Sequence, residues 1–443
     1  MSVKQSYVIA AEAWQALESS IIYYRGNPIG TLAAGDYSSP ALNYDQCFVR
    51  DFVPAALIFL TRGRSEIVRN FLLETLKLQI KEKQLDFLEP GRGLMPASFK
   101  VLHQGSEEFL KADFGDHAIG RVTPVDSCLW WTFLLRAYVQ ATGESSFAHS
   151  PEMQKGIRLI IELCLSARFD MGINGHPLEI QALFHTTLRC AKELLLYNKE
   201  NIKILQAIEN RIPPLTSHIR HNYWLDPEKL NVIYRYHSEE YGEDALNQFN
   251  IYAESIPYAE LSEWFPEQGG YLAGNLGPSH LDCRFFALGN MMAILSSLAT
   301  LQQGQIILHT IEQKWEDLIG WMPMKICFPA LKNRDWQILT GCDPKNRPWS
   351  YHNGGNWPVL LGFFVAAAVK MDRVDLAQRA IDIAAKRLHK DEWVEYYDGK
   401  NGRLVGKEAR KYQNWTISSF LLAQELIDEP KYLDWISHDW VKL

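Results

Sequence analysis

A carboxylate set among aromatic residues is the feature of this sequence that could do chemistry most directly. Glu395 lies between Trp393 and the pair Tyr396 and Tyr397, and a turn follows before a basic and aromatic run. In carbohydrate-binding proteins aromatic rings cover the apolar faces of pyranoses, while carboxylates bind hydroxyls or transfer protons. This combination therefore predicts a sugar site.

The residues that follow Glu395 add groups that could hold a substrate. Arg410 and Gln413 lie in the same stretch, which ends at Trp415. A guanidinium and an amide can hydrogen-bond sugar hydroxyls, although these two side chains could equally neutralise a neighbouring acid and solvate a helix start. We interpret residues 391–415 as one half of a disaccharide-hydrolase site, with Glu395 as one of its two catalytic groups.

Further polar residues along the chain could line the same pocket or serve the fold alone. They are Arg50, Asp51, Asp126, His176, Glu179, Gln181, Asp282, Arg284, His352, Asn353 and Trp357. An Arg-Asp pair in an apolar run is commonly a structural salt bridge, and an acid that follows a Thr-Pro or Gly-His-Pro sequence could simply charge a helix start. The two glycines after Asn353 permit close approach of the backbone to a ligand.

Composition argues against several classes of partner and cofactor. The net charge is −7 and no long Arg/Lys run occurs, so no nucleic-acid partner is expected. No window approaches roughly 18 uninterrupted apolar residues, so we expect no membrane span, and the N-terminus lacks the features of a signal peptide. The seven cysteines have no C-x-x-C spacing, so free thiols in a reducing cytoplasm are expected. No metal, nucleotide or serine-hydrolase motif is present.

The elements that would position these residues are almost all helices. Apolar periodicity predicts helices at about 5–24, 45–60, 64–82, 124–141, 152–167, 176–198, 200–220, 284–302, 306–319, 356–370, 373–389 and 412–427. Residues 86–123, 269–282 and 340–355 are interpreted as irregular, and strand-like alternation is scarce.

No linker or shift of composition divides the chain, so we predict one domain over residues 1–443. Helices in this number must pack in layers to bury a core. Six inner and six outer helices in an all-α (α/α)6 barrel would do so, with the long loops gathered at one end around a pocket. An open helical solenoid is the alternative, but no repeat of fixed period supports it.

Five segments, in order along the chain, match the motifs of a known family. They are residues 43–54, 124–131, 175–184, 351–358 and the run that begins at 395–398. On these motifs the chain resembles the alkaline/neutral invertases of cyanobacteria and plants, glycoside hydrolase family 100. The resemblance covers nearly the whole length and implies an (α/α)6 barrel that hydrolyses sucrose to glucose and fructose. It also implies a homo-oligomer that needs no metal or organic cofactor.

The resemblance also implies a mechanism, since the family resembles inverting glucosidases. One carboxyl protonates the glycosidic oxygen, and another activates water on the opposite face of the sugar, about 6.5–9.5 Å away. Glu395 matches the glutamate of the family's Trp-Pro-Glu-Tyr-Tyr-Asp motif, with Val394 in place of the proline. The match implies that Glu395 is the base.

The family's catalytic acid has no counterpart in this sequence. Phe169-Asp170-Met171 runs directly into Gly172, and about seventeen residues that the family has here, an ordinary loop length, are absent. Asp170 lies at the edge of this gap and is the candidate to replace the acid. Because losing a general acid typically costs about 10²–10⁴ in rate, a non-hydrolysing sucrose-binding relative is one alternative. A hydrolase of another α-glucoside, such as trehalose, is a second.

The resemblance favours the pocket interpretation for most candidate binding residues, because they fall within the matched motifs. Arg50 and Asp51 belong to the first motif, and the candidates around Glu179 and His352 belong to later ones. For Asp126, and for the pair at 282 and 284, pocket lining and a structural role stay equally open.

Overall fold

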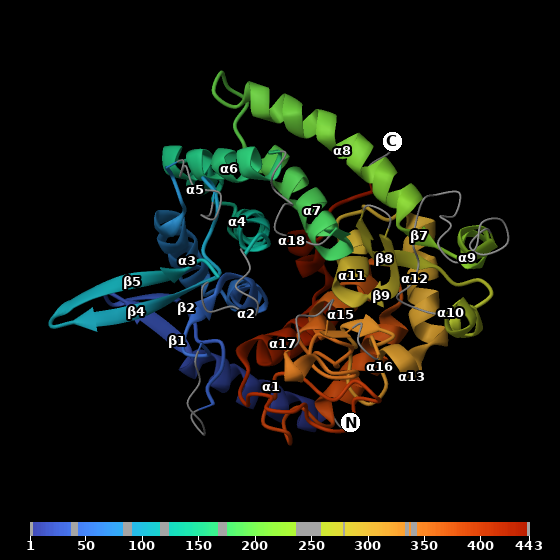
Figure 1. Ribbon diagram of the computed structural model, residues 1–443. Helices are drawn as coiled ribbons and strands as arrows, with labels where there is room; N and C mark the ends of the chain where they lie inside the picture. Colours follow the sequence, from blue (N-terminus) through green and yellow to red (C-terminus); the bar gives the residue numbers. More distant parts are fainter. Residues whose placement is uncertain are drawn as a thin grey trace.

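Helices in two concentric rings form the body of the protein (Figure 1). The computed structural model describes residues 3–36, 43–82, 91–115, 124–166, 175–235, 258–277, 280–332, 336–337 and 343–440. Within these ranges six inner helices form a closed ring, in which each packs on the next and the last returns to the first. They are α2 (Val49–Thr61), α4 (Ser127–Thr142), α7 (Leu178–Leu194), α11 (Ala287–Leu295), α15 (Leu360–Lys370) and α17 (Asn414–Asp428).

Outer helices alternate with the inner ones along the chain and pack against them. They are α1 (Val3–Ser19), α3 (Ser65–Leu78), α6 (Pro151–Cys164), α8 (Ile202–Asn222), α12 (Leu301–Gln313) and α16 (Val374–Ala385). Each outer helix returns the chain across the barrel, so the inner helices run parallel to one another. The described part of the chain is thus the predicted (α/α)6 barrel, and that prediction is confirmed.

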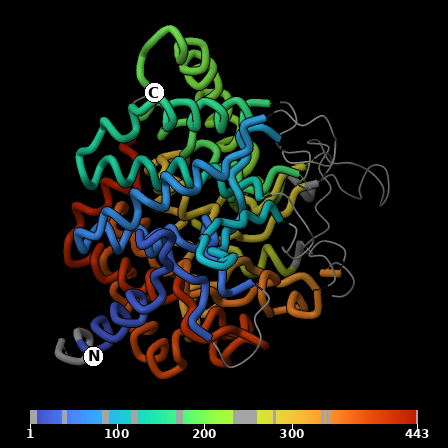
Figure 2. Tube along the Cα trace, turned by 90° about the vertical axis from the view of Figure 1, so that its left-hand side faces the viewer, coloured from blue at the N-terminus to red at the C-terminus, as the bar shows by residue number. Residues whose placement is uncertain are grey.

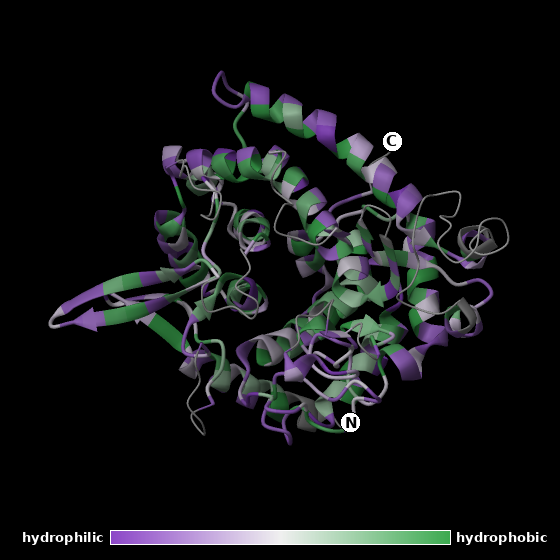
Figure 3. Ribbon diagram, in the orientation of Figure 1, coloured by the Kyte–Doolittle hydropathy of each residue, from purple (hydrophilic) through white to green (hydrophobic). Residues whose placement is uncertain are grey.

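The hydrophobic pattern explains which helices are inside. In α15 every residue from Leu360 to Ala368 is buried, and a helix that is apolar all round must be covered all round. In α16 the buried residues recur on one face, with Leu376, Ala380 and Ala384 four residues apart. Figure 3 shows the same contrast, with apolar inner helices and polar outward faces on outer helices such as α8.

The ring is closed by elements from opposite ends of the chain. α17 packs against both α1 and α2, and Figure 2 shows the N-terminal helix beside the last elements of the chain. The backbone joins here too, because the Asn414 amide donates to the carbonyl of Ala33 at 2.9 Å. Closing the barrel therefore requires contacts across almost the entire sequence.

The predicted helix at residues 5–24 is wrong at its C-terminal end. β1 (Ile21–Tyr24) pairs with β2 (Asn27–Thr31) as an antiparallel hairpin. The isoleucines and tyrosines of β1 favour an extended backbone. Arg25 and Gly26, with φ of 51° and 77°, form the two-residue turn with left-handed conformations that such hairpins require.

Two further sheets lie in segments that were predicted to be irregular. β4 (Ser98–Gln104) and β5 (Glu107–Asp113) form a hairpin that also pairs with β3 (Cys47–Phe48). β8 (Tyr271–Gly277) and β9 (His280–Phe286) pair with each other. The remaining strands are β6 (His176–Pro177) and β7 (Trp224–Leu225), which pair with β8, and β10 (Cys327–Phe328), which pairs with β9.

The strand β8 escaped prediction because both of its faces are covered. Tyr271, Leu272 and Ala273 are all fully buried, so the strand shows no alternation of apolar and polar residues. The strand β9 runs directly into α11, which begins at Ala287 rather than at residue 284 as predicted. β3 and β6 precede α2 and α7 in the same way, so short strands set where these inner helices start.

Short elements complete the described chain. They are α5 (Ser145–Ala148), α9 (Pro227–Arg235), α10 (Tyr258–Trp264), α13 (Trp315–Leu318), α18 (Leu433–Ile436) and the 3-10 turns η1 (Pro344–Asn346) and η2 (Pro430–Tyr432). None of the described helices is long and apolar enough to cross a membrane. The cysteines at 47, 128, 164, 190, 283 and 327 are free and buried, and Cys342 lies outside the described residues.

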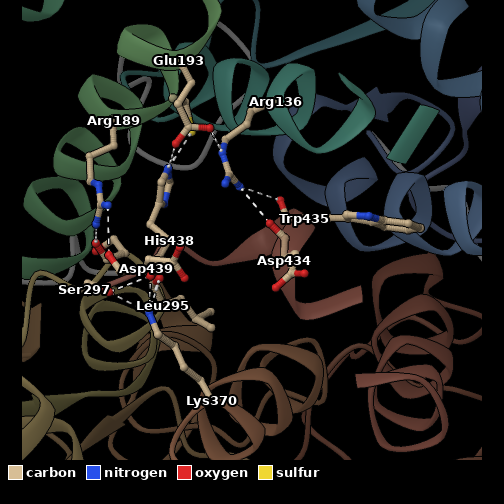
Figure 4. Close-up of polar contacts among 12 residues, drawn as sticks. Arg136, Arg189, Glu193, Leu295, Ser297, Lys370, Asp434, Trp435, His438 and Asp439 are labelled. Carbon is tan, nitrogen blue, oxygen red and sulfur yellow. Dashed lines mark hydrogen bonds and ion pairs between the residues drawn. The ribbon is translucent and has the colours of Figure 1, made fainter. Parts of the chain in front are cut away.

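Cations of the inner helices, one buried and two partly buried, fasten the C-terminal segment to the barrel (Figure 4). Lys370 of α15 donates to the carbonyl of His438 at 2.7 Å, and Arg189 of α7 donates to the carbonyl of Asp439 at 3.1 Å. Arg136 of α4 donates to two carbonyls of α18, each at 3.2 Å. Three inner helices therefore hold the last described residues through main-chain carbonyls, which do not depend on side-chain identity.

We expect Lys370→Met to destabilise the fold by about 1–3 kcal/mol. Besides the carbonyl of His438, the Lys370 ammonium also donates to the carbonyls of Ile294 and Leu295 and to the hydroxyl of Ser297. Methionine would fill the space without donating to any of them. Urea unfolding measures the change. Lys431→Met is the matched control, since that side chain is 66% exposed, and equal effects of the two substitutions would contradict the anchoring role.

Candidate active site

A cavity of about 300 Å³ lies at the N-terminal ends of the inner helices. Each of the six inner helices contributes to its wall through the first turns: Pro54, Trp130, Glu179, Leu288, Leu360 and Trp415. Loop residues complete the lining, among them His352 and Trp357. Because helix N-termini carry partial positive charge, their convergence favours carboxylates and electron-rich oxygens in this cavity.

Glu395 is held by donors near one side of this cavity. The side chain is almost fully buried, and Tyr44 donates its hydroxyl to Glu395 Oε1 at 2.8 Å. Tyr351 lies 3.5 Å from the same oxygen, and the Arg410 amide donates to Oε2 at 3.4 Å. Burial raises the pKa of Glu395, and the positive charge of Lys345 is the largest effect that opposes the rise. A buried, oriented carboxylate with a raised pKa is suited to accept a proton from water.

A series of contacting aromatic rings connects Glu395 to the cavity wall. The Tyr351 ring lies 4.3 Å from that of His352 and 5.0 Å from that of Trp357, both of which line the cavity. Trp357 in turn packs edge-on against Trp415 at 5.2 Å. Burial and the charge of Arg50 lower the pKa of His352 to about 4, so its imidazole is neutral near pH 7. The wall is therefore an uncharged aromatic surface, as sugar rings prefer.

Arg50, which also lines the cavity, is the centre of a group of acids. Its guanidinium lies 3.1 Å from Asp126 and 3.7 Å from Asp51. Burial raises the pKa of Asp51 to about 7, and Arg50 opposes the rise. Burial likewise raises the pKa of Glu179 to about 7, again opposed by Arg50. The site thus contains carboxyl groups that exchange protons near neutral pH alongside one held in an ion pair.

Several buried polar atoms of the site have no hydrogen-bond partner within the described residues. They are Asp51 Oδ1, both side-chain amide atoms of Gln413, and the indole nitrogens of Trp130 and Trp415. Buried polar groups are rarely left unpaired, since each costs about 1–3 kcal/mol. Trp130 and Trp415 line the cavity, so a bound ligand with hydroxyl groups would supply the missing partners.

The structure brings together most, but not all, of the predicted site residues. Arg50, Glu179, His352 and Trp357 line the cavity. Asp51 and Asp126 adjoin Arg50, and Gln413 is the residue before α17. The Arg410 guanidinium packs over the Tyr44 ring at 5.2 Å, on the Glu395 side. Asp170 lies outside the described residues.

Other predicted residues serve the surrounding framework. Asp282 and Arg284 lie on β9 and pair with each other, with Arg284 Nε 2.9 Å from Asp282 Oδ1. Asn353 bonds to the main chain of Leu331 and Asn346, which holds the loop before α15. His176 forms part of β6, and Gln181 is a half-buried residue of α7; neither lines the cavity. No described cluster of His, Cys, Asp or Glu could hold a metal ion.

Sequence reasoning missed residues that act on Glu395 from distant parts of the chain. Tyr44 is 351 positions away from Glu395 in the sequence, and Tyr351 and Lys345 come from a third segment. Tyr44 and Tyr351 both fall within matched motifs, so their presence there was the available signal. Trp130 also lies in a matched motif, but the sequence around it does not indicate whether its side chain lines a cavity or belongs to the hydrophobic core.

We expect Asp51→Asn to change the pH dependence of stability. The pKa of Asp51 is raised to about 7 in the folded state. In the wild type, the contribution of this group to the free energy of unfolding therefore falls as the pH rises from about 4 through 7. Asparagine removes that loss, so the unfolding temperature of the variant relative to wild type should increase between pH 5 and pH 8. A difference in unfolding temperature between variant and wild type that stays constant with pH would contradict the raised pKa of Asp51.

The fold first defines a class of protein. A solved wild-type glycosidase superposes with a TM-score of 0.60 at 10% identity, covering 96% of this chain and 97% of that one. At this identity the likeness concerns the fold alone, which is that of helical-barrel glycosidases.

The family follows from closer relatives. A family model described as alkaline and neutral invertase matches residues 13–430. Cytosolic invertase 1 of Oryza sativa subsp. japonica is 52% identical over 98% of this chain and 80% of its own length. Alkaline/neutral invertase C, mitochondrial, of Arabidopsis thaliana is 52% identical over 96% of this chain and 67% of its own. The chain belongs to the alkaline and neutral invertase family, and the resemblance predicted from its motifs is confirmed.

Proposed function

We propose that the protein hydrolyses sucrose to glucose and fructose with inversion at the glucosyl carbon, and that Glu395 is the general base. Glu395 accepts a proton from water while the water oxygen attacks the anomeric carbon. The bond to fructose breaks with its electron pair passing to the fructosyl oxygen, which a second carboxyl group protonates. The observation that carries this role is the buried Glu395 carboxylate, oriented by Tyr44 at 2.8 Å and by the Arg410 amide at 3.4 Å. Orientation and a raised pKa are the two properties a general base requires.

The proposed substrate site is the cavity beneath the aromatic wall. Arg50, His352 and Trp357 line it, and so do Trp130 and Trp415, whose indole nitrogens have no partner among the described residues and are available to sugar hydroxyls. The side-chain amide of Gln413, buried just before α17, also has no partner among those residues. We propose that the remaining candidates support the cavity rather than line it; they are Asp51, Asp126, His176, Gln181 and Arg410. Asn353, Asp282 and Arg284 support the loops around it. The proposal takes the chain as a single-domain cytoplasmic enzyme that forms homo-oligomers and uses no cofactor.

The proposal includes a shortened acid-bearing loop after Met171. The alignment with the rice cytosolic invertase spans 453 positions, which exceeds the 443 residues of this chain. At least ten positions of the relative therefore have no counterpart here. This supports a deletion in the chain without locating it, and Asp170 at the edge of the sequence gap is one candidate acid.

Turnover by the purified protein tests the proposal. Glucose release is measured from sucrose and from trehalose, and NMR follows which anomer of glucose appears first. We expect sucrose turnover with β-glucose as the initial product. Activity on trehalose but not on sucrose, or α-glucose as the first product, would reject the proposal.

The missing family acid favours a second candidate, a sucrose-binding protein without hydrolysis. Calorimetric binding of sucrose without release of glucose would support that function and exclude the first.

A further inference from the structure

Departure of an alkoxide leaving group requires a proton donor across the sugar from the base. Asp126 is committed to its ion pair with Arg50 at 3.1 Å. Asp51 is not part of the cavity lining, and the charge of Glu395 helps to raise its pKa, so it belongs to the base side. Among the acids of the described site, Glu179 alone lines the cavity.

We propose that Glu179 is the general acid of this protein, in the place of the acid that the family carries on the absent loop. This role rests on the proposed function. Glu179 Oε–H gives its proton to the glycosidic oxygen as the bond from that oxygen to the anomeric carbon breaks. The bonding electrons go to the fructosyl oxygen, while water bonds to the anomeric carbon and Glu395 takes its proton. Glu179 and Glu395 then exchange protons with solvent.

The ring places Glu179 across the cavity from the base. Glu179 lies in the first turn of α7, and α7 is diagonally opposite α17 in the closed order of inner helices. Glu395 lies at the other side, because the Glu395 amide bonds to the Arg410 carbonyl at 2.8 Å, just before α17 begins. An inverting mechanism needs its two carboxyls on opposite faces of the substrate, with room for water.

The backbone of Glu179 is tightly held by the neighbouring inner helix. Gly289 of α11 packs so closely that a Cβ there would lie 3.0 Å from the Glu179 amide nitrogen and 2.8 Å from Leu178 Cγ. By contrast, no hydrogen bond or ion pair within 4 Å engages the Glu179 carboxyl among the described residues. A fixed backbone with an uncommitted carboxyl facing a cavity is the geometry of a proton donor rather than of a structural ion pair.

The charged and titratable groups around Glu179 agree with this role. Arg50 from α2 and Asp126 before α4 act on it, and the neutral imidazole of His352 shares the cavity. Apolar Phe286 and Leu288 from the neighbouring strand and helix line the same cavity. Burial dominates and raises the pKa of Glu179 to about 7, which keeps a substantial fraction protonated at neutral pH.

The test compares two substrates whose leaving groups differ in their need for a proton. Sucrose requires protonation, whereas α-glucosyl fluoride releases fluoride with little help. We expect Glu179→Gln to lose about 10²–10⁴-fold in kcat on sucrose and to stay within about tenfold of wild type on the fluoride. The alkaline limb of the sucrose pH profile should disappear, and Glu179→Asp should recover part of the sucrose activity. Asp170→Asn is the matched comparison and should show no such split.

Equal losses on both substrates would make Glu179 a binding residue and overturn the proposal. A split seen with Asp170→Asn instead of Glu179→Gln would transfer the role to Asp170. Wild-type protein that turns over neither substrate would overturn the proposed function, and this role with it. Unfolding temperatures of the variants identify any loss of activity that comes from misfolding.

Discussion

Glu395→Gln is expected to lower kcat on sucrose by about 10²–10⁴-fold while sucrose still binds. Glutamine preserves the volume of the buried side chain, and its carbonyl oxygen can still accept from Tyr44, but it cannot take a proton from water. The loss should therefore appear in kcat rather than in KM. Steady-state kinetics measures the first, and calorimetry on the variant measures binding directly.

Glu408→Gln provides the matched control for this substitution. Glu408 lies on the same segment as Arg410, but its side chain is 67% exposed and forms an ion pair with Lys407 at the surface. Its replacement should leave both kinetic constants near the wild-type values. If Glu395→Gln retained wild-type turnover, the base would have been misassigned and the carboxylate would be a structural group.

Arg50→Met should weaken sucrose binding and move the pH profile to higher pH. A charge-assisted hydrogen bond to a hydroxyl contributes about 1.5–3 kcal/mol, which corresponds to a roughly 10- to 150-fold rise in KM. Arg50 also opposes the rise in pKa of Asp51 and Glu179, so both values should increase above about 7 when it is removed. The alkaline limb of kcat/KM should shift accordingly.

Arg50→Lys separates these two effects. Lysine retains the positive charge but not the planar, forked donor, so the alkaline limb should stay in place while KM still rises. An unchanged KM in Arg50→Met would show that Arg50 does not bind the substrate and acts only by lowering the pKa values of the acids around it. The same measurement on Asp126→Asn would reveal whether its ion pair with Arg50 orients the guanidinium for the substrate.

The elements that could be predicted are those whose local hydrophobic pattern is enough to indicate both the type of secondary structure and how the element is buried. Inner helices such as α15 are apolar throughout and long enough to exclude a buried strand, so their existence was evident. The strands β8 and β9 were missed because a short, fully covered strand has no alternation to detect. Had β9 been recognised, Asp282 and Arg284 would have been placed on one face, two residues apart, as a mutual pair.

The site residues also fall into two groups: those that a sequence motif reveals and those that only the tertiary structure reveals. Glu395, Arg50 and Glu179 are visible because they occur in motifs matched to a family. The contact of Tyr44 with Glu395 is a property of ring closure, which brings the segment before α2 against the segment before α17. No local pattern encodes that contact, and so the group that orients the proposed base could be found only in three dimensions.

The closure of the ring between α2 and α17 has a consequence for biosynthesis. A ribosome adds roughly 5–20 residues per second, and domains fold as their sequence emerges. Here Tyr44 and Arg50 emerge long before Glu395 and Gln413, and packing of α17 on α2 brings the two segments together. Until α17 emerges, the nascent chain is an open arc of helices whose apolar inner faces are uncovered at both ends. We therefore expect dependence on chaperones to be greatest for ribosome-bound chains that stop before residue 414.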